Sequence, residues 1–219
     1  GGTPYRDVWS HTFPASGLLY AVVGSTVGLK PFTPQLIHLL ESLAGVGLVY
    51  IAGKLALSRR HGLVGAYVFA LASMLMVGFD HVAEPDFLAG LAGLVTTVLL
   101  LVSRSGSAYP PHLRRGLALF GAGFASGIAI ATKPVAVPLV VMAVLWIWWA
   151  FSDGRFKHAL YYAAGTGVVP LLLLAWLFSA NAVGDMAEQA LVFNSYYASD
   201  KGSLLTFFGG IAVNGLAVG

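Results

Sequence analysis

The sequence predicts an all-α, polytopic membrane protein with about seven transmembrane helices and one amphipathic helix beside the membrane on its outer face. Of the 219 residues, 58% are hydrophobic and only 10% are charged, and the mean hydropathy is +0.81. A soluble domain of this length has no core large enough to hide so much apolar surface. The apolar residues also gather into runs of roughly 20, the length that a helix needs to cross the hydrocarbon of a bilayer.

The spans are placed by run length and by the prolines and charges that interrupt the runs. We predict spans at 34–57, 62–79, 85–102, 116–132, 134–151 and 159–180, and an incomplete one from about residue 204. One helix over 116–151 would be about 54 Å long, well beyond the roughly 30 Å of hydrocarbon. Lys133-Pro134 is therefore predicted as a tight hairpin, because the residue before a proline resists the helical conformation and proline suits a first helical turn.

Charge alternates along the connections. The basic residues of loops 54–61, 104–115 and 153–157 are Lys54, Arg59, Arg60, Arg104, Arg114, Arg115, Arg155 and Lys157, against the single acid Asp153. The carboxylates of the intervening loops are Asp80, Glu84, Asp86, Asp185, Glu188 and Asp200. Short basic loops stay in the cytoplasm during insertion, so the acidic connections are predicted to lie outside. This topology accounts for the basic excess and argues against a nucleic-acid partner.

Residues 14–29 break the alternation of spans. This segment is apolar but about 16 residues long, and it contains Gly17, Gly24 and Gly28, which weaken a helix. If it crosses the membrane, residues 1–13 lie inside; if it lies along the interface, they join the acidic loops outside. The residues alone leave both arrangements open.

The densest polar cluster precedes the span that begins at Pro85. Glu84 suits the cap of that helix, and Asp86 falls in its first turn, where the helix dipole favours a carboxylate. A charged helix start at a membrane surface explains both residues. The functional alternative is that Glu84 or Asp80 acts as a general base or holds a divalent cation, the one cofactor that these residues suggest.

Three further groups are candidates for substrate binding. Lys133 either snorkels to the headgroups or neutralises the phosphate of a lipid substrate. His38 and Glu41 share one polar stripe with Gln35, and either tie neighbouring helices or face a substrate. In the long loop predicted at 181–203, Asn194 and Tyr197 suit hydrogen bonds to a polar substrate, although such groups also serve as interfacial anchors.

The order of four motifs is similar to that of a known family. The motifs are Pro4-Tyr5-Arg6-Asp7 with the following Val8-Trp9-Ser10-His11, Ala83-Glu84-Pro85-Asp86-Phe87, Ala131-Thr132-Lys133-Pro134, and Val192-Phe193-Asn194-Ser195-Tyr196-Tyr197. Together they resemble the GT-C glycosyltransferases, especially the bacterial relatives of protein O-mannosyltransferases and aminoarabinose transferases. The resemblance implies that residues 14–29 lie on the outer face. It divides the chain into an extracytoplasmic loop with an interfacial helix (1–33) and a transmembrane bundle that is incomplete at both ends (34–219).

The resemblance also implies a reaction, in which a sugar on a polyprenyl phosphate passes to a lipid or protein acceptor outside the cytoplasmic (inner) membrane. Glu84 matches an acidic position of the family, and Asp80 and Asp7 are further catalytic candidates. Lys133 matches the lysine that faces phosphate, and Arg6 and His11 join it as binding candidates. The principal catalytic aspartate of the family precedes the first motif, so we expect this fragment to be inactive alone. A rival interpretation is a membrane transporter or lipid scramblase with His38 and Glu41 along its path.

Overall fold

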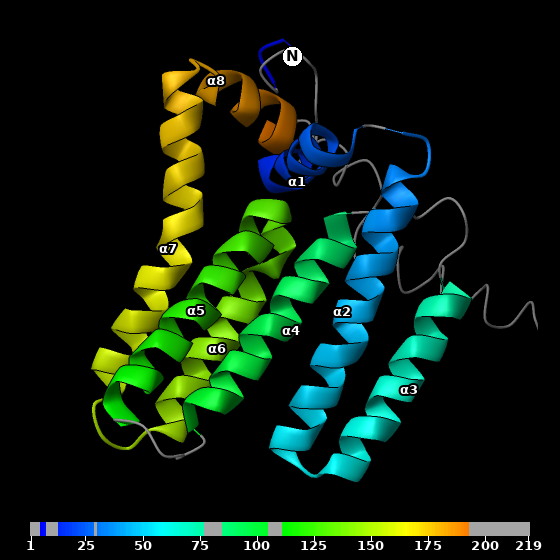
Figure 1. The fold of residues 1–219 in the computed structure, drawn as a ribbon. Coiled ribbons are helices and arrows are strands. Elements are labelled where there is room, and N and C mark those ends of the chain that lie inside the picture. The colour runs from blue at the N-terminus through cyan, green and yellow to red at the C-terminus, as the bar shows by residue number, and fades with distance from the viewer. Residues whose placement is uncertain (1–4, 8–12, 29, 77–84, 105–110, 193–219) are drawn as a thin grey trace, which may run out of the picture. The chain divides into compact units, whose positions relative to one another are not determined.

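The computed structural model describes residues 5–7, 13–28, 30–76, 85–104 and 111–192, and every regular element in this part of the chain is helical (Figure 1). The elements are α1 (Pro14–Val27), α2 (Thr33–Ala56), α3 (Arg59–Met76), α4 (Pro85–Arg104), α5 (Pro111–Thr132), η2 (Pro134–Ala136), α6 (Val137–Ala150), α7 (Arg155–Ser179), α8 (Val183–Met186) and η3 (Ala187–Val192). The all-α prediction is confirmed for the described residues.

Internal contacts divide the chain into two compact units. The larger unit covers 12–175 and holds α1 to α6 with most of α7, and the smaller one joins residues 1–11 to everything from 176 onward. The division predicted at residue 33 rests on sidedness, which the structure does not test, and it stays a prediction.

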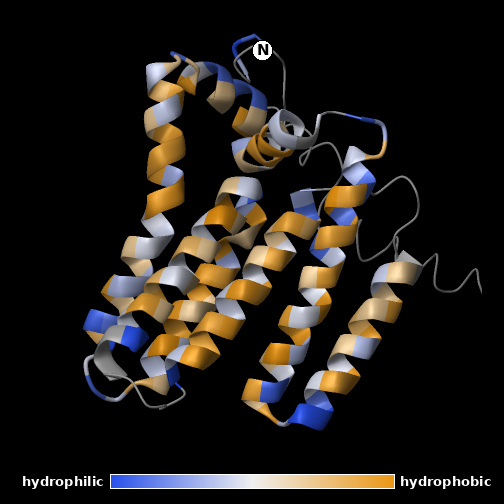
Figure 2. Cartoon of the chain, viewed as in Figure 1, coloured by the Kyte–Doolittle hydropathy of each residue, from blue (hydrophilic) through white to orange (hydrophobic). Residues whose placement is uncertain are grey.

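The helices α2 to α7 alternate in direction, as the span pattern predicts, and the connections that the structure describes between them are short turns (Figure 1). The turn after α5 confirms the predicted hairpin: Lys133 is extended, with φ −152° and ψ 115°, and Pro134 opens the next helical segment. The α2–α3 turn brings two backbones together, because a Cβ built on Gly53 would lie 2.8 Å from the Cα of Gly62. These turns set the polar ends of α2, α4 and α5 at the ends of the unit, with mostly hydrophobic residues between them (Figure 2).

Four helices of the described chain are long and apolar enough to cross a membrane. They are Thr33–Ala56, Pro85–Arg104, Arg114–Thr132 and Arg155–Ser179. Large apolar side chains remain exposed on the helices of the larger unit, including Val64, Tyr67 and Met74 on α3, and Met142 on α6. Water disfavours such a surface, whereas lipid accepts it. The fold is thus compatible with a membrane protein, and the total of seven spans stays a prediction.

The centre of the larger unit is built on α5, whose buried side chains are mostly small. Ala122 and Ala129 are fully buried, and so is Ser126, whose hydroxyl accepts a 2.7 Å hydrogen bond from Tyr162 on α7. Gly123 and Gly127 face the same helix, and a Cβ on Gly123 would lie 2.0 Å from the carbonyl oxygen of Tyr162. The four-residue glycine spacing therefore serves close helix packing, as the sequence predicts.

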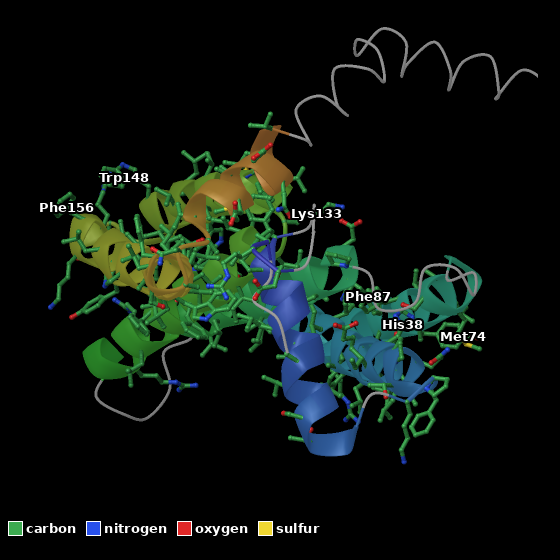
Figure 3. The ribbon with its side chains drawn as sticks, turned by 90° about the horizontal axis from the view of Figure 1, so that it is seen from above. His38, Met74, Phe87, Lys133, Trp148 and Phe156 are labelled. Carbon is green, nitrogen blue, oxygen red and sulfur yellow. The ribbon has the colours of Figure 1, made fainter. Side chains whose placement is uncertain are left out.

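The helix α1 is a short element that contacts α5 and α2. Its 14 residues span about 21 Å at about 1.5 Å per residue, less than the hydrocarbon thickness. It lies crosswise at the end of the unit where α2 begins (Figures 1 and 3). Its length and direction favour the interfacial alternative over a crossing. The predicted amphipathicity is weak, because Ser25 and Thr26 share the side of the helix that carries Leu18 and Val22, and the opposite side carries Gly17 and Gly24 and no charged residue.

Candidate functional site

A lysine and a carboxylate meet at the end of the larger unit where α4 begins and α5 ends. The ammonium group of Lys133 donates to Asp86 in a close ion pair. The two side chains are 41% and 58% exposed, and an ion pair this exposed contributes at most about 1 kcal/mol to stability. Little free energy therefore opposes an exchange of Asp86 for another anion as the partner of Lys133.

Asp86 of this ion pair also lines an apolar cavity of about 360 Å³ between three helices. Its lining residues are Gly45 on α2, Phe69 on α3, and Asp86, Phe87, Gly90, Leu91 and Leu94 on α4. Gly90 leaves room for it, since a Cβ built there would meet no atom within 4 Å. Asp86 is the charged residue of this lining, and Lys133 pairs with it, so the cavity suits the apolar part of a ligand whose anionic end replaces Asp86 on Lys133.

The side chains of His38 and Glu41 come from α2, in the first turns above Gly45. The imidazole of His38 packs edge-on against Phe87, with 4.7 Å between ring centroids, and the two residues lie next to each other in Figure 3. Its Nε2 lies 3.5 Å from the Ser42 hydroxyl, whereas its Nδ1 has no hydrogen-bond partner among the described residues. Glu41 is only 7% exposed, and its Oε2 also finds no partner in the described part of the chain.

These orphaned atoms bear on the predicted polar stripe. The structural alternative for the stripe is a His38–Glu41 pair that ties neighbouring helices. In the described part of the chain, these two side chains make no hydrogen bond to each other. A buried carboxylate oxygen without a donor costs free energy, and proteins retain such a group where a ligand or a proton supplies the missing contact. The stripe is therefore a stronger binding candidate than its spacing alone suggests.

The smaller unit fixes the predicted residues Arg6 and Asp7. The guanidinium of Arg6 donates to both carboxylate oxygens of Asp7, at 3.0 and 3.1 Å, and to the carbonyl of Ala180 at 3.1 Å. Gln189 donates to the carbonyl of Tyr5 at 2.7 Å. The bond to Asp7 raises the pKa of Arg6 above its ordinary value, so this cation stays charged. Arg6 and Gln189 thereby join the segment 5–7 to the helical segments that follow residue 176.

The end of α7 gives Arg6 its carbonyl partner. Asn181 has a φ of +50°, and the amide of Ala182 donates to the carbonyl of Leu177 at 2.9 Å. This is the glycine-type helix ending with asparagine in the left-handed position. It turns the chain into α8 and η3, so the prediction of a loop over 181–203 was wrong for residues 183–192. Apolar residues at Val183, Met186 and Ala190 follow a helical period, and Ala190 is buried.

Alkaline pH should loosen the smaller unit through Tyr5. The phenol is 3% exposed, and burial raises its pKa to about 12, whereas an unfolded tyrosine titrates near 10. A raised pKa means that stability is complete below pH 10 and is lost as pH rises toward 12, by about 2 to 3 kcal/mol. We expect Tyr5→Phe to remove most of this loss, measured as unfolding at pH 9 and pH 11.5. An equal alkaline loss in Tyr5→Phe would contradict the assignment.

Several predicted site residues lie outside the described part of the chain. They are Asp80, Glu84, His11, Asn194 and Tyr197. Of the described candidates, the structure places Lys133 beside Asp86, His38 beside Phe87, and Arg6 beside Asp7. Sequence reasoning assigned Asp86 to the helix dipole and missed it as the partner of Lys133. It also missed Gln189, which carries no signal before the helix is known.

A metal centre has no support from the described residues, which contain no group of three His, Cys, Asp or Glu side chains placed to hold an ion. The predicted divalent cation would need Asp80 or Glu84, and it stays a prediction. Compared with family models, with curated proteins and with solved structures, the chain gives no match.

Proposed function

We propose that this chain is part of a membrane glycosyltransferase that moves a sugar from a polyprenyl-phosphate carrier to an extracytoplasmic acceptor. The observation that carries the proposal is the apolar cavity lined by Asp86, the residue that Lys133 pairs with. A lipid phosphate needs an apolar path for its chain and a cation for its phosphate, and the cavity and Lys133 are linked through Asp86. The order of motifs that resembles the GT-C glycosyltransferases supports the same substrate class.

The roles of the residues follow from the chemistry of transfer. The departing lipid phosphate gains negative charge, which Lys133 stabilises once it exchanges Asp86 for the phosphate. The acceptor hydroxyl needs a carboxylate base, for which we propose Glu84, with Asp80 and Asp7 as the next candidates. His38 and Glu41 offer sugar or acceptor hydroxyls a ring nitrogen and a carboxylate oxygen that have no partner among the described residues. Arg6, His11, Asn194 and Tyr197 remain proposed binding residues.

Filling the cavity should stop the reaction without harming the fold. Gly90→Leu adds a side chain into open space, so we expect transfer from a radiolabelled mannosyl or aminoarabinosyl polyprenyl phosphate to fall at least about tenfold in the full-length protein. Gly47→Leu is the matched control, because a Cβ there also meets nothing within 4 Å and Gly47 does not line the cavity. Unchanged transfer in Gly90→Leu would remove the cavity from the proposed substrate path.

The proposed orientation is testable because the chain contains no cysteine. We expect Glu84→Cys and Lys133→Cys to react with an impermeant maleimide in intact cells, and Arg59→Cys to react only after the membrane is opened. The reason is that short basic loops remain in the cytoplasm. Labelling of Arg59→Cys alone would reverse the orientation and remove the outer active site.

A transporter or lipid scramblase is the second candidate, and one observation favours it. Glu41 is a buried ionisable residue on a helix long enough to span, and such residues commonly mark ion or lipid pathways. Purified protein in vesicles with a fluorescent phospholipid separates the two functions. Scrambling that Glu41→Gln abolishes, without any sugar transfer by the full-length protein, would replace the glycosyltransferase with this candidate.

A further inference from the structure

The opposite end of the larger unit carries a group of cations stacked on aromatic rings. The distances from cation to ring centroid are 5.4 Å for Arg104 on Trp149, 5.3 Å for Arg155 on Trp148, 5.0 Å for Arg115 on Phe151 and 5.9 Å for Lys157 on Tyr161. The rings at the end of α6 thus receive guanidinium groups from α4, α5 and α7. We name these eight residues the stacked basic cluster.

No described carboxylate neutralises the charge of this cluster. Among the described residues, none of its four cations lies within 4 Å of a carboxylate oxygen, and Asp153 is the one acid in its loops. Arg115 donates to the carbonyl of Ser103 at 3.3 Å. Arg104 and Arg155, by contrast, are exposed, and in the described part of the chain each pairs only with its aromatic ring.

Stacking leaves a guanidinium ready for an anion. The cation lies over the ring, and the N–H donors of a guanidinium form a fork that matches two oxygens of a phosphate. The contact with the ring also restricts the long side chain before the anion arrives, so less entropy is lost on binding. Arg104 and Arg155 are therefore two candidate phosphate-binding residues at the end of α6.

The surroundings of the two arginines are apolar and open. Trp149 is 74% exposed and Trp148 is 48% exposed. Phe156, which follows Arg155 in the sequence, is 68% exposed. Trp148 and Phe156 project from the side of the bundle opposite His38 and Met74 (Figure 3). Exposed tryptophans at the end of a membrane helix lie at headgroup depth. A partner for this surface must bring a phosphate together with an apolar body.

We propose that the stacked basic cluster binds an anionic phospholipid, with its phosphate on Arg104 or Arg155 and its acyl chains along α6. A phospholipid supplies the anion and the apolar contact in one molecule, and its acyl chains match the exposed Val141, Met142 and Leu145 of α6. The proposal requires that α6 lies in the membrane. It does not depend on which side is cytoplasmic or on the sugar-transfer function, since Lys133 lies at the other end of the unit.

Tryptophan quenching tests the proposal, because three of the five tryptophans, Trp146, Trp148 and Trp149, lie in or next to the cluster. The full chain is placed in nanodiscs of 80% phosphatidylcholine and 20% phosphatidylglycerol, with bromine on the chains of one lipid at a time. We expect brominated phosphatidylglycerol to quench as if it were enriched about threefold beside the protein over its share of the disc. In Arg104→Gln/Arg155→Gln, quenching by brominated phosphatidylglycerol should fall to the level expected from its share of the lipid in the disc.

Two further variants keep the result decisive. Arg59→Gln/Arg60→Gln removes the same amount of charge at the same end of the unit. Both arginines are exposed, and neither lies over a ring among the described residues. This variant should therefore retain the preference for phosphatidylglycerol. Arg104→Lys/Arg155→Lys keeps the charge but loses the fork, so an intermediate preference is expected. Quenching by each lipid only in proportion to its share of the disc, in the unchanged protein, would overturn the proposal. An equal loss in the Arg59/Arg60 variant would also overturn it, as a general charge effect.

Discussion

Replacing Lys133 with glutamine should lower sugar transfer by the full-length protein about a hundredfold, the loss typical of removing one group that stabilises charge in a transition state. The proposed reaction leaves a negative phosphate near Asp86 of the cavity lining, and Lys133 is the cation that pairs with Asp86. The amide of glutamine keeps the length of the side chain roughly but carries no charge. The measurement is kcat/KM with a radiolabelled polyprenyl-phosphate sugar.

The ion pair with Asp86 makes the result interpretable. If the pair only joins α4 to α5, then Lys133→Gln and Asp86→Asn break the same contact, and each should cost the same. If Lys133 serves the phosphate, Asp86→Asn releases it and should leave kcat/KM within about threefold or raise it. The pair would be shown to be structural by two results together. Asp86→Asn would lower kcat/KM as much as Lys133→Gln does, and the double variant would lower it no further.

The parts of this fold that the sequence predicts are those that depend on one segment at a time. A span follows from its own run of apolar residues, and the hairpin at Lys133-Pro134 follows from two adjacent residues. The helices α2 and α4 begin within one residue of their predicted starts at 34 and 85. The position of a span and the position of a hairpin both depend on nearby residues, so they can be predicted without knowing the neighbouring helices.

The candidate site depends on contacts between distant segments, and the sequence carries little signal for those. Asp86 and Lys133 are 47 residues apart, and their pairing requires that α4 and α5 pack side by side. The same holds for α8 and η3, because a helix this short is marginal alone and needs contacts such as the one from Gln189 to Tyr5. Lipid-facing and core-facing apolar residues also look alike in a sequence, so the cavity beside Gly90 was not predictable.

The close contact of α5 with α7 should be the most sensitive point of the fold. A Cβ on Gly123 would lie 2.0 Å from the carbonyl oxygen of Tyr162, and one on Gly165 would lie 2.0 Å from that of Phe120. Both obstacles are backbone atoms, which cannot rotate away, so the helices must separate. We expect Gly123→Ala or Gly165→Ala to cost about 3 kcal/mol or more, at the upper end for overpacking.

The size of the effect is tested by unfolding in mixed detergent micelles, with Gly167→Ala as the control on the same helix. Its Cβ would lie 3.7 Å from Leu171, an ordinary contact, so its cost should stay below about 0.5 kcal/mol or become a gain from the helix propensity of alanine. The double variant Gly123→Ala/Gly165→Ala should cost less than the two single losses added, because one separation of the helices relieves both clashes. Strictly additive losses would mean that each glycine acts on its own surroundings and that α5 and α7 do not share one contact.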